Sequence, residues 1–327
     1  MYILFFAGFA ALLFGAKFLV DGAASIGKKS GMSQLVIGLT VVALGTSLPE
    51  LVINVFASME NSTDLAIGNV VGSNITNSFL IIGIAAMIYP ITMAGVVFRF
   101  DVVISLLATI VLIVLANFTS FGGQAVFIDR KDGMILLAFF IFFLIYLYFN
   151  SRKQGNIETE SNIKILTNGK SSAYIIAGSV GLYFGGKWII NGATQVATDL
   201  GVSESVIALT LVAGATSLPE LVTSIVAARK KNTDMAVGNA VGSNIFNIFL
   251  VLGVSALITP IEYNPQLNTQ LFILLGSGIL LILFILIDVE KIFKRNIPKT
   301  KRAISGIEGI IMVLAYIGFV IYSVFYS

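Results

Sequence analysis

Two glutamates stand out because each lies near the middle of a long apolar run. Glu50 ends the segment Gly-Thr-Ser-Leu-Pro-Glu at 45–50, and Glu220 ends the similar segment Ala-Thr-Ser-Leu-Pro-Glu at 215–220. A charged side chain at the centre of a bilayer costs about 2.5–3.5 kcal/mol on insertion scales. Two such charges need a compensating partner, and a cation is the simplest one.

A proline stands directly before each glutamate, at Pro49 and Pro219. Proline cannot donate the helical N–H bond and clashes with the carbonyl four residues earlier, so it breaks a helix. The helices should open around Thr46–Ser47 and Thr216–Ser217, which frees carbonyl and hydroxyl oxygens beside each carboxylate. Such hard oxygen ligands suit Ca²⁺ or Na⁺.

A second motif adds a polar helix face to each copy. Gly-Asn-Val-Val-Gly-Ser-Asn-Ile-Thr-Asn at 68–77 is nearly repeated at 238–247. Residues four apart share one helix face, and we expect this face to line an ion path. Its members are Asn69, Ser73 and Asn77 in the first copy and Asn239, Ser243 and Asn247 in the second.

The two motifs belong to a longer internal repeat. A shift of 170 residues aligns 36–77 with 206–247 without a gap, and 25 of the 42 positions are identical. This predicts two homologous halves, 1–149 and 172–327, joined by a polar linker at 150–171.

The composition places these halves in a membrane. Of the 327 residues 57% are hydrophobic and 11% charged, against about 45–50% and 25% in soluble domains. This excludes a soluble or disordered protein. A spanning helix needs about 20 apolar residues. Ten runs predict an all-α polytopic membrane protein with ten transmembrane helices, at 2–26, 34–58, 65–88, 100–117, 134–149, 172–196, 204–228, 235–259, 268–287 and 303–325.

Five spans in each half is an odd number, so the second half should be inverted relative to the first. With both termini on one side, the opposite loops hold 15 basic residues, whereas the other side holds Arg130 and Lys131. The positive-inside rule then puts both termini outside the cytoplasm, in a plasma or inner membrane.

The residue types also exclude some chemistry. The chain has no cysteine and no histidine, so it has no disulfide framework, thiolate metal site or imidazole proton relay. The net charge of +3 gives no reason to expect nucleic acid as a partner.

The four motif copies, in this order, resemble the cation/calcium exchanger superfamily, and most closely its prokaryotic sodium/calcium exchanger branch. The resemblance covers the whole chain. It implies a secondary active antiporter, not an enzyme, that exchanges Na⁺ for Ca²⁺ by alternating access. It implies no cofactor beside the transported ions, and we expect a monomer in the lipid bilayer to suffice. Spans 1 and 6 would slide across a core of spans 2, 3, 7 and 8.

The resemblance also implies roles for single residues. The calcium site would comprise Thr46, Glu50, Thr216 and Glu220. One sodium site would comprise the Ala43 carbonyl, Thr46, Ser47, Glu50 and Ser73, and its inverted twin the Ala213 carbonyl, Thr216, Ser217, Glu220 and Ser243. Asn77 and Asn247 would stand between them. Many members of the family carry Asp at the position of Asn247, so the number of Na⁺ ions bound could differ here.

Several alternatives stay open. The same glutamates could exchange Ca²⁺ or another divalent cation for H⁺, or require K⁺ as well; the Ser47/Ser73 and Ser217/Ser243 pairs favour Na⁺. A passive channel or a calcium-binding sensor is a different class, which single-channel currents would reveal. The glycines of spans 1 and 6, among them Gly15, Gly22, Gly181 and Gly185, would provide either a sliding surface or static packing.

Overall fold

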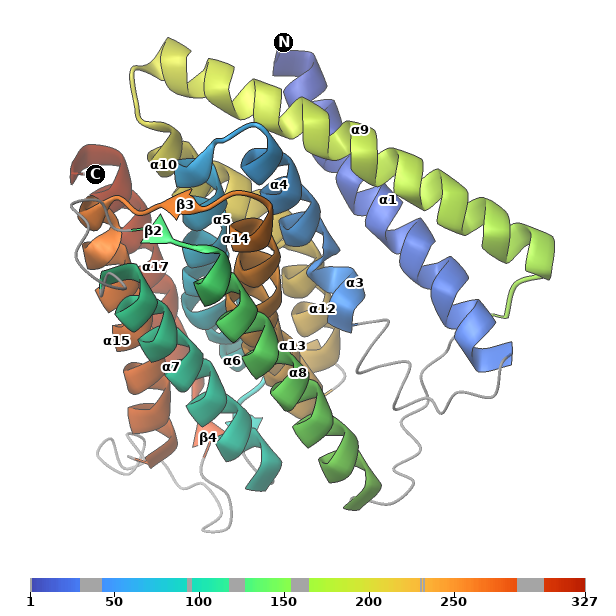
Figure 1. The fold of residues 1–327 in the computed structure, drawn as a ribbon. Coiled ribbons are helices and arrows are strands. Elements are labelled where there is room, and N and C mark those ends of the chain that lie inside the picture. Colours follow the sequence, from blue (N-terminus) through green and yellow to red (C-terminus); the bar gives the residue numbers. More distant parts are fainter. Residues whose placement is uncertain are drawn as a thin grey trace.

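The computed structural model describes residues 2–29, 43–92, 96–117, 127–153, 165–229, 231, 233–286 and 303–326. These residues form helices and two short pairs of strands (Figure 1). The elements of the first half are α1 (Tyr2–Lys29), α3 (Ala43–Thr46), α4 (Leu48–Met59), α5 (Thr63–Ile75), the π-helix η2 (Thr76–Ile81), α6 (Ile82–Ile88), β1 (Ile91–Thr92), α7 (Val96–Asn117), β2 (Phe127–Ile128) and α8 (Arg130–Lys153).

The second half follows a similar order. Its elements are α9 (Asn168–Leu200), α10 (Glu204–Ile207), the π-helix η3 (Ala208–Val212), α11 (Ala213–Thr216), α12 (Leu218–Arg229), α13 (Thr233–Phe246), the π-helix η4 (Asn247–Leu252), α14 (Gly253–Ile258), β3 (Ile261–Glu262), the 3₁₀-helix η5 (Pro265–Leu267), α15 (Asn268–Leu286), β4 (Ala303–Ile304) and α17 (Gly306–Tyr326).

Helices run through most of the described part of each predicted span, but fewer are long and apolar enough to cross a membrane. Among the described residues six helices qualify, or up to seven if the pair Ser205–Thr216 and Leu218–Arg229, bent by 45°, is one span. Residues 30–42, which belong largely to the predicted span 34–58, lie outside the described part. The structure thus shows a helical protein with spanning helices, and the count of ten stays a prediction.

Both predicted helix breaks occur. Ser47 separates α3 from α4 with φ −90° and ψ 6°, and Ser217 separates α11 from α12 with φ −79° and ψ 5°. Pro49 and Pro219 are the second residues of α4 and α12, where a missing N–H costs nothing because the first turn has no intrahelical acceptor. Each proline therefore starts a new helix beyond the break.

Helices α1 and α9 form an antiparallel pair along one flank of the bundle (Figure 1). Tyr2 is hydrogen-bonded to Asp199 at one end, and at the other the Lys29 Nζ donates to Asn168 Oδ1 at 2.7 Å. Between them the backbones nearly touch, because a Cβ at Gly15 would lie 2.8 Å from the backbone nitrogen of Leu182.

Most glycines of the first and sixth predicted spans serve this pairing. A Cβ would meet the partner backbone at 2.8 Å at Gly22, 3.0 Å at Gly181 and 2.7 Å at Gly185. These four glycines face the other helix of the pair and not the core, whereas Gly186, the fifth glycine of this prediction, faces Val52 and Phe56 of α4. The four pack α1 and α9 into one unit.

The last helix of each half packs on the other half. Helix α17 lies against α6, and α8 lies against α14. Each contact continues into an antiparallel strand pair, β1 with β4 and β2 with β3. A Cβ at Gly83 would lie 2.9 Å from the Gly309 carbonyl, and one at Gly133 2.9 Å from the Gly253 carbonyl. The two halves are therefore interlocked.

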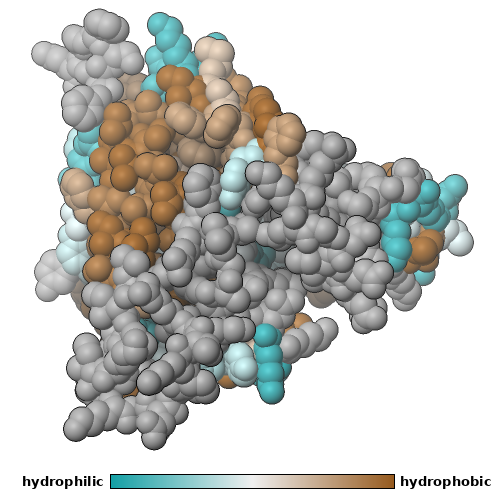
Figure 2. Space-filling model, turned by 90° about the horizontal axis from the view of Figure 1, so that it is seen from below, coloured by the Kyte–Doolittle hydropathy of each residue, from teal (hydrophilic) through white to brown (hydrophobic). Residues whose placement is uncertain are grey.

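The outer surface is apolar, as lipid contact requires. Figure 2 shows hydrophobic residues gathered over one side of the described surface. Large hydrophobic side chains of the outer helices are exposed, among them Phe142 at 71%, Phe272 at 58% and Leu314 at 60%. Contact of large apolar side chains with water is unfavourable in free energy. These exposed helix faces therefore fit a bilayer.

Candidate ion-binding site

The two helix breaks face each other and bring both glutamates into the interior. Glu50 lies in the first turn of α4 and Glu220 in the first turn of α12, and both side chains are fully buried. Ser217 Oγ donates to Glu50 Oε1 at 3.4 Å. Ser47 Oγ donates to Glu220 Oε1, also at 3.4 Å. Each carboxylate is thus contacted by the serine at the break of the other half.

The serines of the second motif also lie where the two halves meet. Ser243 Oγ donates to Glu220 Oε1 at 3.1 Å and accepts from Ser47 Oγ at 3.3 Å. Ser73 Oγ donates to the Ala213 carbonyl at 3.5 Å and lies 3.4 Å from Thr216 Oγ1. These contacts arise because α5 packs on η3 and α11, while α13 packs on α3.

The contacts do not follow the grouping expected for the two sodium sites, although Ser243 does contact the glutamate of its own half. That grouping drew the carbonyl, threonine and serines of each set from the same half as the glutamate. The structure instead joins Ser73 to Ala213 and Thr216, and Ser47 to Glu220. The residues are the expected ones, but each set mixes the two halves.

Asn69 and Asn239 bind backbone instead of pointing along an open path. Asn69 Nδ2 reaches the Glu50 carbonyl at 3.5 Å, and Asn239 Nδ2 reaches the Glu220 carbonyl at 3.1 Å. Asn69 Nδ2 also donates to Asn54 Oδ1 at 2.7 Å, and Asn239 Nδ2 to Ser224 Oγ at 3.2 Å. These amides brace the first turns that carry the glutamates.

The sequence analysis missed Asn54 and Ser224. Both are fully buried, and each donates to a backbone carbonyl, of Ala66 at 2.9 Å and of Ala236 at 3.0 Å. The signal was present, because 54 and 224 are equivalent positions of the repeat and both carry a polar residue in an apolar run.

Asn77 and Asn247 lie where the π-helices begin. Asn77 is the second residue of η2, and Asn247 is the first residue of η4. Both side chains are fully buried. Their Oδ1 atoms have no hydrogen-bond partner within the described part of the chain. π-Helical turns often occur at functional sites, and here they accompany two unsatisfied oxygens.

Within the described part of the chain, no basic side chain pairs with either glutamate. Glu50 Oε2 and Glu220 Oε2 are buried and have no hydrogen-bond partner among the described residues. The ion pair found among these residues joins Lys17 and Asp21, at 3.0 Å, and involves neither glutamate. Burying a carboxylate without a partner is costly. In the same described ranges no three His, Cys, Asp or Glu side chains cluster. The site thus offers two carboxylates among neutral oxygens.

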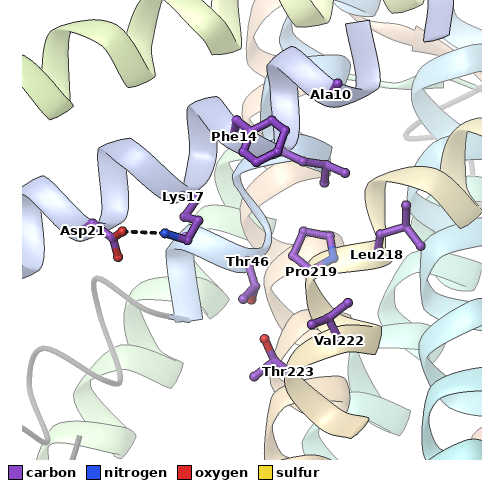
Figure 3. Close-up of a pocket in the computed structure, with 11 residues that line it drawn as sticks. Ala10, Phe14, Lys17, Asp21, Thr46, Leu218, Pro219, Val222 and Thr223 are labelled. Carbon is purple, nitrogen blue, oxygen red and sulfur yellow. Dashed lines mark hydrogen bonds and ion pairs between the residues drawn. The ribbon is translucent and has the colours of Figure 1, made fainter. Parts of the chain in front are cut away.

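A cavity of about 650 Å³ lies beside the site, between α1 and the two helix breaks (Figure 3). Thr46 and Pro219 adjoin it on the site's side, and the Lys17–Asp21 pair adjoins it on α1. Its other lining residues are Ala10, Leu13, Phe14, Gly45, Leu218, Val222 and Thr223. The cavity therefore brings open space up to a residue of the predicted calcium site.

The sequence is similar to those of proteins described as sodium/calcium exchangers. The family described as "Sodium/calcium exchanger protein" matches residues 1–149 and 170–325. The sodium/calcium exchanger MaX1 of Methanosarcina acetivorans is 30% identical over 98% of this chain and 97% of its own. The inner membrane protein YrbG of Escherichia coli is 36% identical over 80% of this chain and 81% of its own.

The structure resembles a solved exchanger as well. The sodium-calcium exchanger NCX_Mj aligns with a TM-score of 0.64 and 31% identity, covering 100% of both chains. Fold, sequence and a buried site of carboxylate and neutral oxygens agree. This chain belongs to the sodium/calcium exchanger family.

Proposed function

We propose that the chain is a secondary active antiporter that exchanges Na⁺ for Ca²⁺ at a site built on Glu50 and Glu220. The observation that carries this proposal is a set of four buried oxygens without a described partner. They are Glu50 Oε2, Glu220 Oε2, Asn77 Oδ1 and Asn247 Oδ1. Oxygen-only, mixed charged and neutral ligands are what Ca²⁺ prefers.

We propose ligand sets that combine the expected residues with the contacts between the halves. Ca²⁺ would be held by Glu50, Glu220, Thr46 and Thr216, with the free oxygens of Asn77 and Asn247 facing it from the centre of the site. One Na⁺ would be held by Ser47, Ser243, Glu220, Thr46 and the Ala43 carbonyl, and another by Ser73, Ser217, Glu50, Thr216 and the Ala213 carbonyl. Both ions need the same two carboxylates. A charge of −2 is neutralised by one Ca²⁺ or by Na⁺ in the flanking sites, so the ions compete.

Unequal packing of α1 and α9 supports alternating access. The cavity separates α1 from α12, whereas α9 packs closely on α4. A Cβ at Gly186 would lie 2.8 Å from both Phe56 and Val52, and the rings of Phe56 and Tyr183 are 5.4 Å apart. One approach to the site is thus open while its counterpart is closed, as a single-sided access state requires.

The inverted arrangement is supported by how equivalent segments meet. The first helices of the two halves, α1 and α9, run antiparallel. Lys17 and Asp21 lie in the half of α1 that ends at Lys28 and Lys29. The loop that follows this end is predicted to be cytoplasmic. On this assignment both termini are extracytoplasmic, the membrane is the plasma or inner membrane, and the cavity faces the cytoplasm.

Single cysteines at two equivalent positions test this orientation. Met59 and Arg229 occupy equivalent, exposed positions, and the absence of native cysteine removes any background. A membrane-impermeant maleimide should label Met59→Cys in intact cells, and Arg229→Cys after permeabilisation only. Labelling of both from outside would disprove the inversion.

Transport in vesicles tests the function itself. Purified protein in liposomes loaded with Na⁺ should accumulate radioactive Ca²⁺ when Na⁺ is diluted outside. Liposomes with equal Na⁺ on both sides are the control and should show no accumulation. A pH gradient or a K⁺ gradient that drives the same uptake without Na⁺ would assign the coupling to H⁺ or K⁺ instead. Ca²⁺ entry that needs no gradient of Na⁺, H⁺ or K⁺, together with single-channel currents, would disprove antiport.

A further inference from the structure

Two further asparagines, Asn74 and Asn244, lie between the halves and occupy equivalent positions of the repeat. They lie on α5 and α13, three residues before Asn77 and Asn247, and their side chains are 0% and 4% exposed. The side chain of Asn74 donates through Nδ2 to the Asn244 carbonyl at 3.2 Å. Neither residue belongs to the ligand sets above.

Each of these asparagines accepts a hydrogen bond from the central asparagine of the other half. Asn77 Nδ2 donates to Asn244 Oδ1 at 3.1 Å, and Asn247 Nδ2 donates to Asn74 Oδ1 at 3.0 Å. An amide has one oxygen and one nitrogen at its end. When the nitrogen is engaged on one side, the oxygen must face the other. This is the side on which Asn77 Oδ1 and Asn247 Oδ1 have no described partner.

The accepting amides are themselves oriented by hydrogen bonds. Asn244 Nδ2 donates to Ser78 Oγ at 2.9 Å, and Asn74 Nδ2 is held by the Asn244 carbonyl. Turning either amide over would place an NH₂ group against the NH₂ of Asn77 or Asn247 and leave two buried donors facing each other. The Asn244 carbonyl can only accept, so it fixes Asn74 and through it Asn247, whereas the Ser78 hydroxyl can donate as well as accept and orients Asn244 less strictly.

We propose that Asn74 and Asn244 are positioning residues that turn the oxygens of Asn247 and Asn77 toward the transported cation and so set its affinity. This inference rests on the proposed function. A cation binds oxygen and repels an amide NH₂, so a central asparagine that rotates freely spends part of its time in a repelling orientation. Removing the hydrogen bond that orients it should weaken binding, although no ligand atom is lost.

The effect of one substitution at Asn74, compared in three backgrounds, tests this orientation directly. Asn74→Leu should weaken Ca²⁺ binding about tenfold, the equivalent of a lost hydrogen bond. In an Asn247→Asp background both terminal atoms are oxygens, orientation no longer matters, and the same change should cost less than about twofold. In an Asn77→Asp background it should again cost about tenfold, since Asn77 is oriented by Asn244. Calorimetric titration of purified protein with Ca²⁺ gives, for each background, the ratio of the Ca²⁺ dissociation constants with and without Asn74→Leu.

The same comparison with the substitution placed at Asn244 is the matched control. Asn244→Leu should be rescued by Asn77→Asp and not by Asn247→Asp. Asn74→Ala, which removes the same groups without the bulk of leucine, should give the same pattern if Asn74→Leu does not fold. An equal loss in all backgrounds would mean that Asn74 acts through packing alone and would overturn the inference. Absence of Ca²⁺ binding by the unaltered protein would instead overturn the proposed function.

Discussion

Glu50→Gln and Glu220→Gln are each expected to lower Na⁺-dependent Ca²⁺ uptake by about a hundredfold or more. Each change keeps the shape of the side chain and removes one of the two charges that face the cation. Breaking a buried charge pair costs about 2–5 kcal/mol, and every 1.4 kcal/mol is about tenfold in affinity. Uptake into Na⁺-loaded liposomes measures the loss.

Thermal unfolding separates this effect from misfolding. Without Na⁺ or Ca²⁺, the glutamine variants should be at least as stable as the unaltered protein, because they remove a buried charge that has no described basic partner and whose Oε2 atom has no described hydrogen bond. Added Ca²⁺ should raise the melting temperature of the unaltered protein but not that of the two glutamine variants at Glu50 and Glu220. Glu60→Gln, at an exposed turn, is the control and should retain both uptake and the Ca²⁺ shift. Full uptake by both site variants would refute the proposed site.

Gly72→Ala is expected to destabilise the protein by about 1–3 kcal/mol, the usual cost of overpacking, and to impair transport. A Cβ at Gly72 would overlap the Leu209 carbonyl oxygen and lie 2.7 Å from Ala213 Cβ. Helix α5 would have to move away from η3 and α11. Ser73, the next residue, would then lose its contact with the Ala213 carbonyl.

A second glycine in a helix controls for the loss of glycine itself. Gly276 is exposed on α15, and a Cβ at this position would have no described atom within 4 Å. Gly276→Ala should leave uptake unchanged and stability equal or slightly higher, since alanine favours the helix. Equal melting temperatures and uptake rates for Gly72→Ala and Gly276→Ala would contradict the close contact between α5 and η3.

Local features of the site could be predicted from the sequence because their causes are local. A carboxylate in an apolar run and a proline beside it determine, within a few residues, a charged helix break. The structure accordingly has its breaks at Ser47 and Ser217. The repeat likewise showed that whatever surrounds Glu50 has a counterpart around Glu220.

The contacts between the halves could not be predicted in this way. Spacing within one repeat does not show that Ser73 lies beside Ala213 of the other. The position of Asn69 on a polar face likewise does not reveal that its amide nitrogen points to the Glu50 carbonyl while its oxygen accepts from Thr216. The π-helical turns at Asn77 and Asn247 have no sequence signal comparable to a proline.

The crossing of hydrogen bonds between the halves bears on how such a chain could arise by gene duplication. A polypeptide of one repeat would supply Glu50 but not Ser217, which contacts it. Two copies inserted in opposite orientations would supply both contacts at once. The ancestor before fusion would therefore have worked as a dual-topology dimer. The fused chain made that pairing permanent and left each copy free to diverge, as Ser78 and its counterpart Ile248 have done.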